Sequence, residues 1–279
     1  MDKQKVSALI CSSERAKQGS RTDPKTTYRS HGAGEPLVFI HGVGMQSAAW
    51  TPQIDAFSHK YHVTALDMPG HGGSDPLPAG SQLADFVAWA KSAISALDVG
   101  AVNLVGHSMG ALIAGGMAVT HPQLVKRVAL LNGVFMRDKA ASSAVLARAA
   151  AIREGKIDLE TPLTRWFDDR QQQERAQVAA WLGEVDQAGY AVAYSAFAGG
   201  DTAYAHHFSQ ITCPFLAMTG DDDPNSTPAM SQAMAAKVQN GQYVTITGHR
   251  HMVNLTAADD VNMHLMRWLE TPLKTKDMQ

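Results

Sequence analysis

One short stretch of the sequence has the residue types and spacing of an activated nucleophile. Residues 106–110 read Gly-His-Ser-Met-Gly, between the strand-like run Val-Asn-Leu-Val and a segment of small residues typical of a buried helix. At a turn from strand to helix, the central serine is exposed above the sheet in a strained backbone conformation. Gly106 and Gly110 suit this turn, because the chain approaches itself closely there. We therefore predict that Ser108 attacks a carbonyl carbon.

Two backbone N–H groups are predicted to stabilise the oxyanion that such an attack creates. One belongs to Met109, directly after the serine. The other is expected in the loop after an earlier strand, where residues 41–44 read His-Gly-Val-Gly, and we assign it to Val43. Losing one such donor costs about 3–4 kcal/mol of transition-state stabilisation. His41 is predicted to be a structural hydrogen-bonding residue at the end of the strand.

The segments that must hold these residues alternate between strand-like and helix-like patterns. Strand-like runs cover 36–42, 62–67, 101–106, 125–133, 213–220 and 242–248, and helix-like runs cover 83–100, 111–122, 228–238 and 257–270. This alternation predicts a doubly wound, mostly parallel sheet with right-handed crossovers. From 135 to 208 only amphipathic helical stretches occur, which predicts a helical cap over one end of the sheet. Residues 26–134 and 209–272 are then the α/β core, and residues 1–25 a polar N-terminal extension.

Taken in order, several motifs resemble those of the α/β-hydrolase fold superfamily. Over about residues 28–270 they read HGVG, LDMPGHGGSD, GHSMG, a helical stretch, TGDDDPNSTP and finally His-Met-Val-Asn-Leu before a last helix. The resemblance implies an α/β fold with a helical cap inserted after the sixth strand. It also implies that a serine nucleophile is followed along the chain by an acid and then by a histidine.

The acid and the base each have competing candidates. Asp221, Asp222 and Asp223 compete for the acid, and the family pattern, which sets the acid three residues after a glycine, favours Asp223, with Asp222 as the runner-up. Its task would be to accept the imidazole N–H and to stabilise the imidazolium. In the family the catalytic histidine lies at a fixed distance before the last helix, and this spacing favours His251 over His249 as the base. His249 is then expected to be a loop residue. A capping box formed by Thr256 and Asp259 is expected to start that helix.

A serine nucleophile predicts acyl transfer through an acyl-enzyme. The cap sequence resembles that of 3-oxoadipate enol-lactonases and small carboxylesterases, which implies a small carboxylic ester or lactone as substrate. Amide or N-acyl cleavage uses the same triad and is an alternative. Carbon–carbon bond hydrolysis is a further and less favoured alternative, because hydrolases of that kind usually have asparagine before the serine and tryptophan after the histidine, where this chain has His107 and Met252. A non-catalytic ligand receptor on the same fold is the alternative from another class.

Cap residues are candidates for substrate binding. Arg165 could clamp a substrate carboxylate, because a guanidinium matches a carboxylate with two hydrogen bonds. Trp166 and Tyr194 are candidate pocket residues, although aromatic residues at helical spacing are more often packing residues.

Composition excludes several other functions. The formal net charge is −2, from 24 basic and 26 acidic residues, which gives no electrostatic footprint for nucleic acid or an anionic membrane. The sequence shows no metal-ligand spacing and no nucleotide-binding glycine loop, so we expect neither metal nor cofactor. Cys11 and Cys213 are too isolated for a disulfide framework, and the apolar run near the start is too short for a signal peptide. We therefore expect a cytoplasmic protein with a small acyl substrate, and we leave homo-oligomerisation open.

Overall fold

The computed structural model describes residues 25–273, so the predicted extension 1–25 and Cys11 lie almost wholly outside the described residues. The strands are Tyr28–His31 (β1), Glu35–Ile40 (β2), Tyr61–Leu66 (β3), Val102–His107 (β4), Val125–Leu131 (β5), Phe215–Gly220 (β6) and Gly241–Ile246 (β7). The helices are Thr51–Phe57 (α1), Leu83–Ala96 (α2), Met109–Thr120 (α3), Lys139–Arg153 (α4), Glu160–Trp166 (α5), Gln172–Glu184 (α6), Gln187–Ala198 (α7), Pro228–Lys237 (α8), Val253–Thr256 (α9) and Ala258–Leu269 (α10).

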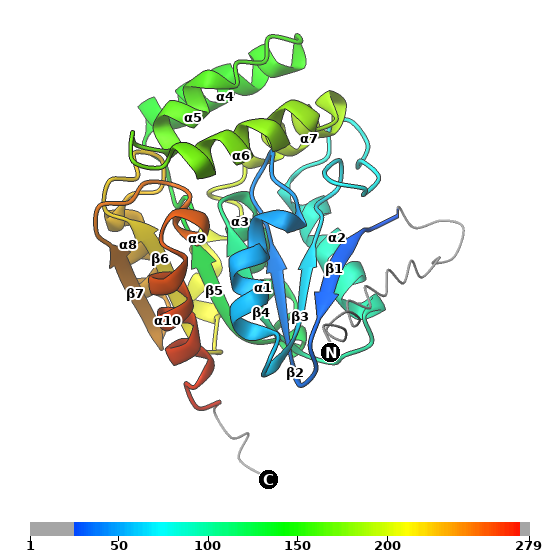
Figure 1. Cartoon of the computed structure of the whole chain (residues 1–279), viewed down its shortest axis with the longest axis vertical. Coiled ribbons are helices and arrows are strands. Elements are labelled where there is room, and N and C mark those ends of the chain that lie inside the picture. The colour runs from blue at the N-terminus through cyan, green and yellow to red at the C-terminus, as the bar shows by residue number, and fades with distance from the viewer. Residues whose placement is uncertain (1–24, 274–279) are drawn as a thin grey trace, which may run out of the picture.

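The strands form one sheet in the order β1-β3-β2-β4-β5-β6-β7. β1 pairs antiparallel with β3, and every other neighbouring pair is parallel. Helices cover both faces, as Figure 1 shows. The predicted α/β fold with a doubly wound, mostly parallel sheet is therefore confirmed.

Side chains alternate along the central strands between two apolar cores. In β2, Val38 and Ile40 face the core beneath α2 and α3, whereas Leu37 and Phe39 face the core beneath α1 and α10. This period of two, with apolar residues at every position, is what a strand buried on both faces requires. The continuous apolar runs in the sequence reflect this double burial.

The helices α4 to α7 lie between β5 and β6 in the chain and above one end of the sheet (Figure 1). They occupy the range for which a helical cap is predicted. The cap follows the fifth strand of the described residues and not the sixth, because these residues form only one strand, the antiparallel β1, before the parallel strands β2 to β5. The expected capping box of the last helix is also wrong, because α10 begins after Ala257 without a side-chain cap and Thr256 ends the short helix α9.

The loops that follow β2, β4, β6 and β7 all leave the same end of the parallel sheet, which is the end that the cap covers (Figure 1). Residues far apart in sequence are thereby brought together, because the carboxyl ends of parallel strands share one edge. None of the helices between residues 25 and 273 combines the length and apolar character that a membrane crossing requires.

Candidate active site

Ser108 lies in a strained turn between β4 and α3. Its φ of 54° and ψ of −114° fall in a region that non-glycine residues rarely adopt. A Cβ on Gly106 would lie 2.0 Å from the Gly110 carbonyl oxygen, and one on Gly110 would lie 2.1 Å from that of Ile40. The chain therefore approaches itself as closely as the sequence predicts, and the serine side chain is 8% exposed.

The His251 imidazole bridges Ser108 and Asp223. Its Nε2 is 3.1 Å from the Ser108 Oγ, and its Nδ1 is 2.7 Å from the Asp223 Oδ2. An ionised carboxylate only accepts hydrogen bonds, so Nδ1 carries the hydrogen and the Nε2 lone pair faces the serine hydroxyl. This is the tautomer in which the imidazole can take a proton from the serine.

The Asp223 carboxylate is buried and held by three donors. Beside His251, the Asn132 amide donates to Oδ2 at 2.9 Å and the Asn225 N–H donates to Oδ1 at 2.8 Å. Burial alone would raise the pKa of this carboxyl, but the His251 ring and these hydrogen bonds outweigh burial, so the pKa lies below its usual value. Asp223 is therefore ionised at neutral pH.

The neighbouring acids lie elsewhere. The Asp221 Oδ1 accepts a hydrogen bond from the Gly248 N–H at 2.6 Å, which closes the turn before the histidine loop. The Asp222 side chain is exposed, and the backbone N–H of this residue donates to the His249 carbonyl at 3.1 Å. Of the three candidates, the structure brings only Asp223 to the imidazole of His251.

His249 points away from the serine. Its Nδ1 shares hydrogen bonds with the Thr256 hydroxyl at 2.9 Å and the Gln171 amide at 3.4 Å. Of the two histidines in this loop, the structure therefore brings only His251 to Ser108.

The two predicted oxyanion donors flank Ser108. Met109 is the first residue of α3, where an N–H has no partner within the helix. Val43 lies in the loop after β2, which passes so close that a Cβ on Gly42 would be 2.9 Å from the Ser108 Cβ. Across residues 25–273, no carbonyl or side chain accepts a hydrogen bond from the Val43 or Met109 N–H. Among the described residues neither N–H is thus paired, as the predicted oxyanion role requires.

Two buried histidines fix the loop that carries Val43. The His41 Nε2 accepts from the Met68 N–H and the His71 Nε2 accepts from the Gly44 N–H, both at 2.9 Å. Burial lowers the pKa of His41 to about 4 and that of His71 to about 3, so both rings are neutral and keep a lone pair to accept with. His41 thus makes the structural contacts expected of it.

The predicted cap residues differ in how near they lie to this site. The Trp166 ring stacks on His251, with 5.6 Å between centroids and 24° between planes. Arg165 is exposed, and its Nη1 is 3.5 Å from the Asn225 Oδ1, beside the catalytic-acid candidate. Within the described part of the chain, Tyr194 has ring contacts with Tyr190 and Phe197 but none with His251.

Two supporting residues were not predicted as such. Asn132 has a φ of 47°, and its amide reaches Asp223 from the end of β5. An Asn-Gly pair at the end of an apolar run is the signal that could have indicated it, because asparagine tolerates this conformation. The Nε2–H of His107 donates to the His251 carbonyl at 2.8 Å. Burial lowers the pKa of His107 to about 3, so this ring is neutral.

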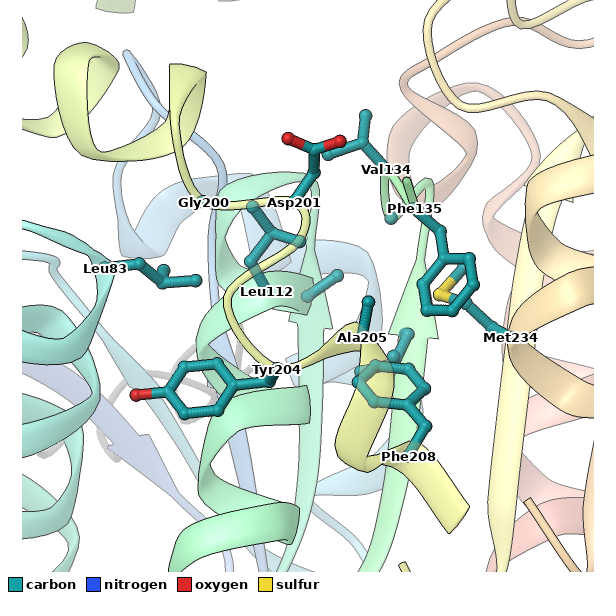
Figure 2. Close-up of a pocket in the computed structure, with 13 residues that line it drawn as sticks. Leu83, Leu112, Val134, Phe135, Gly200, Asp201, Tyr204, Ala205, Phe208 and Met234 are labelled. Carbon is teal, nitrogen blue, oxygen red and sulfur yellow. The ribbon is translucent and has the colours of Figure 1, made fainter. Parts of the chain in front are cut away.

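An apolar pocket lies beside the first turns of α3, as Figure 2 shows. Leu112, Phe135 and Phe208 line it, and Asp201 contributes its polar group, while Ser108 does not line it. Between residues 25 and 273, no three histidine, cysteine or acidic side chains gather as a metal ion would require. The reactive groups that the structure brings together at the site are a hydroxyl, an imidazole and a carboxylate.

Known proteins resemble this chain in sequence. A family model described as the alpha/beta hydrolase fold matches residues 35–258. The (E)-2-((N-methylformamido)methylene)succinate hydrolase of Acinetobacter baylyi is 54% identical over 246 residues, which cover 88% of this chain and 94% of that protein.

Solved structures share the fold at low sequence identity. The enol-lactonase from Burkholderia xenovorans LB400 has a TM-score of 0.80 at 24% identity, over 88% of this chain and 96% of that one. A thermophilic esterase from Thermogutta terrifontis has a TM-score of 0.81 at 19% identity, over 91% of this chain and 96% of that one. The family match spans most of the sequence and agrees with the sheet order and the serine turn. The chain is a hydrolase and belongs to the alpha/beta hydrolase fold family.

Proposed function

We propose that this hydrolase cleaves an N-formyl amide carried by a small dicarboxylate, with Ser108 as nucleophile, His251 as base and Asp223 as acid. The observation that carries the proposal is the 54% identity to a protein named for the hydrolysis of (E)-2-((N-methylformamido)methylene)succinate, over 94% of that protein's length. The sequence motifs favour an ester or lactone first and an N-acyl compound as an alternative. The identity to this relative reverses that order.

The chemistry of such a compound suits a serine nucleophile. Its formyl group is attached to a nitrogen that is conjugated, through a carbon–carbon double bond, with a carboxylate. This conjugation withdraws the nitrogen lone pair from the formyl carbonyl, so the carbonyl is more electrophilic than that of an ordinary amide. The departing nitrogen is also a better leaving group, because its electrons delocalise into the double bond. A triad that cleaves esters is therefore sufficient for this amide.

Acylation would begin when Ser108 attacks the formyl carbon and its proton passes to the His251 Nε2, 3.1 Å away. The Val43 and Met109 N–H groups would donate to the oxyanion. As the C–N bond breaks, the imidazolium returns the proton to the departing nitrogen and a formyl ester remains on Ser108.

Deacylation would reverse the proton transfers with water in place of the amine. Water gives a proton to His251 and attacks the formyl carbon, the bond to the Ser108 Oγ breaks, and the serine regains its proton. Asp223 stabilises the imidazolium in both steps, because its Oδ2 accepts the Nδ1–H at 2.7 Å. The products are formate and the N-methyl enamine of the dicarboxylate.

We assign recognition of a substrate carboxylate to Arg165. This guanidinium lies on α5 next to Trp166, and within residues 25–273 its single hydrogen bond, at 3.5 Å to Asn225, leaves further donors for a ligand. Trp166 and Tyr194 would contribute apolar surface from the cap. Arg165→Gln should raise KM for the dicarboxylate about tenfold, as loss of a hydrogen bond to a charged group predicts. Hydrolysis of the neutral ester p-nitrophenyl acetate should be unchanged in this variant.

The direct test is the release of formate from the N-formyl enamide by the purified protein, measured through NADH formation with formate dehydrogenase. Ser108→Ala should lower kcat on the order of 10⁶-fold. If only p-nitrophenyl acetate is hydrolysed, in a Ser108-dependent manner, the amide proposal is wrong and an ester hydrolase stands. If neither compound is hydrolysed, the result favours the alternative of a non-catalytic ligand receptor.

A further inference from the structure

The loop that carries His251 is hydrogen bonded to the cap through the preceding residue, Arg250. The Arg250 Nη1 donates to the Thr164 carbonyl at 2.9 Å and to the Phe167 carbonyl at 2.6 Å. These two carbonyls lie at the end of α5, on either side of Trp166 in the chain. One guanidinium therefore holds the backbone segment whose indole stacks on the His251 ring.

The backbone of Arg250 is tied to the other side of the site. Its carbonyl accepts a hydrogen bond from the Asn132 amide at 3.3 Å, and the same amide donates to the Asp223 Oδ2 at 2.9 Å. Arg250 thus connects two groups that flank the imidazole, namely the acid through its backbone and the cap indole through its side chain.

The stacked indole acts differently on the two charge states of the base. When His251 takes the proton from Ser108, its ring becomes a cation, and a cation over an indole face is attracted by the ring quadrupole. The His251 side chain is 4% exposed, so water screens this attraction little. The contact therefore stabilises the transition state more than the resting enzyme, which is the requirement for a gain in rate.

We propose that Arg250 is a positioning residue, which holds the end of α5 so that Trp166 stays on the face of the His251 imidazole. The triad then reaches its full reactivity only while this part of the cap is docked. The inference rests on the proposed triad but not on the proposed substrate.

The test uses inactivation by diisopropyl fluorophosphate, a small neutral reagent. Its phosphorus bonds to the Ser108 Oγ, fluoride leaves and the serine proton passes to His251, so the rate reports the serine, its base and the oxyanion donors but not the recognition of a substrate carboxylate. Trp166→Ala and Arg250→Met should each slow inactivation about tenfold, as expected for a desolvated cation–π contact. The double variant should be no slower than Trp166→Ala, because Arg250 acts through the indole. Arg250→Lys keeps one donor nitrogen, with three N–H groups, and should recover part of the rate.

Arg170→Met is the matched control. The Arg170 guanidinium also reaches the histidine loop from the cap, with its Nη2 2.8 Å from the Gly248 carbonyl, but it is not bonded to α5. Its inactivation rate should equal that of the wild type. If Arg250→Met does not fold, Arg250→Lys replaces it in the same double-mutant comparison.

Three results with the variants would overturn the inference. Arg250→Met could slow inactivation equally with and without Trp166, which is the mark of a merely structural role. Arg170→Met could slow it as much as Arg250→Met does. Trp166→Ala could leave inactivation unchanged and raise only KM for the substrate. If diisopropyl fluorophosphate does not label the wild-type protein, the triad assignment is wrong as well. If the wild type is labelled but does not hydrolyse the formamide, only the proposed substrate is wrong.

Discussion

Replacing Asp223 by asparagine separates the role of the carboxylate charge from that of its shape. All three groups that contact the carboxylate are donors, namely the His251 Nδ1, the Asn132 amide and the Asn225 N–H. An amide NH2 therefore faces a donor in either orientation. Where it replaces Oδ2, it also reverses the His251 tautomer, so that a hydrogen and not a lone pair faces Ser108.

We expect Asp223→Asn to lower kcat by about 10⁴-fold, which corresponds to about 5.5 kcal/mol. Two contributions account for it, the lost stabilisation of the imidazolium and the lost lone pair at Nε2. Asp222→Asn is the control, because the Asp222 side chain is exposed. The activity of this variant should stay within about twofold of that of the wild type. Steady-state kinetics on p-nitrophenyl acetate and on the formamide would measure both. Activity of Asp223→Asn within tenfold of the wild type, or inactivity of Asp222→Asn, would refute the assignment.

Three further predictions concern the base, the acid and the serine turn. His251→Ala should abolish turnover in the same kinetic assay, whereas His249→Ala should change only KM or nothing, and the reverse would show that the wrong histidine is assigned. The pKa of the Asp223 carboxyl is lowered in the folded protein, so its contribution to the free energy of unfolding is complete above about pH 4 and is lost as the pH falls through the pKa of the folded state. Urea unfolding of the wild type at a series of pH values should show this loss on the acid side. The same loss in Asp223→Asn would contradict the prediction. Gly110→Ala, whose Cβ would lie 2.1 Å from a backbone carbonyl, should lower the free energy of unfolding by about 3 kcal/mol. Gly183→Ala, on open helix surface, should not lower it, and equal losses in the two glycine variants would count against the close approach.

The sequence predicts the sheet and the serine turn well, because both are local patterns. A strand buried on two faces must be apolar at every position, and a nucleophile turn must have glycine where the backbone passes closest. The position of the cap after a sixth strand is implied by the family resemblance alone, because the sequence itself shows four strand-like runs before residue 135. The structure adds one strand to these four, β1, which is short and largely exposed and therefore carries no apolar signal.

The supporting residues of the site could not be predicted in the same way. Asn132 and Arg250 act through contacts with residues 91 and 86 positions away in the chain, which no spacing rule connects. The stacking of Trp166 on His251 likewise depends on how the cap docks, and an isolated aromatic residue is more often a packing residue. Such contacts follow from tertiary structure and not from any local pattern.

The proposed mechanism requires that the Ser108 oxygen becomes acylated, with His251 as the base. Mixing the protein with p-nitrophenyl acetate, quenching in acid and mapping peptides by mass spectrometry would test it most directly. One acetyl group is expected on Ser108, absent from Ser108→Ala and strongly reduced in His251→Ala. Acetylation of another residue during turnover, or undiminished turnover by Ser108→Ala, would contradict it.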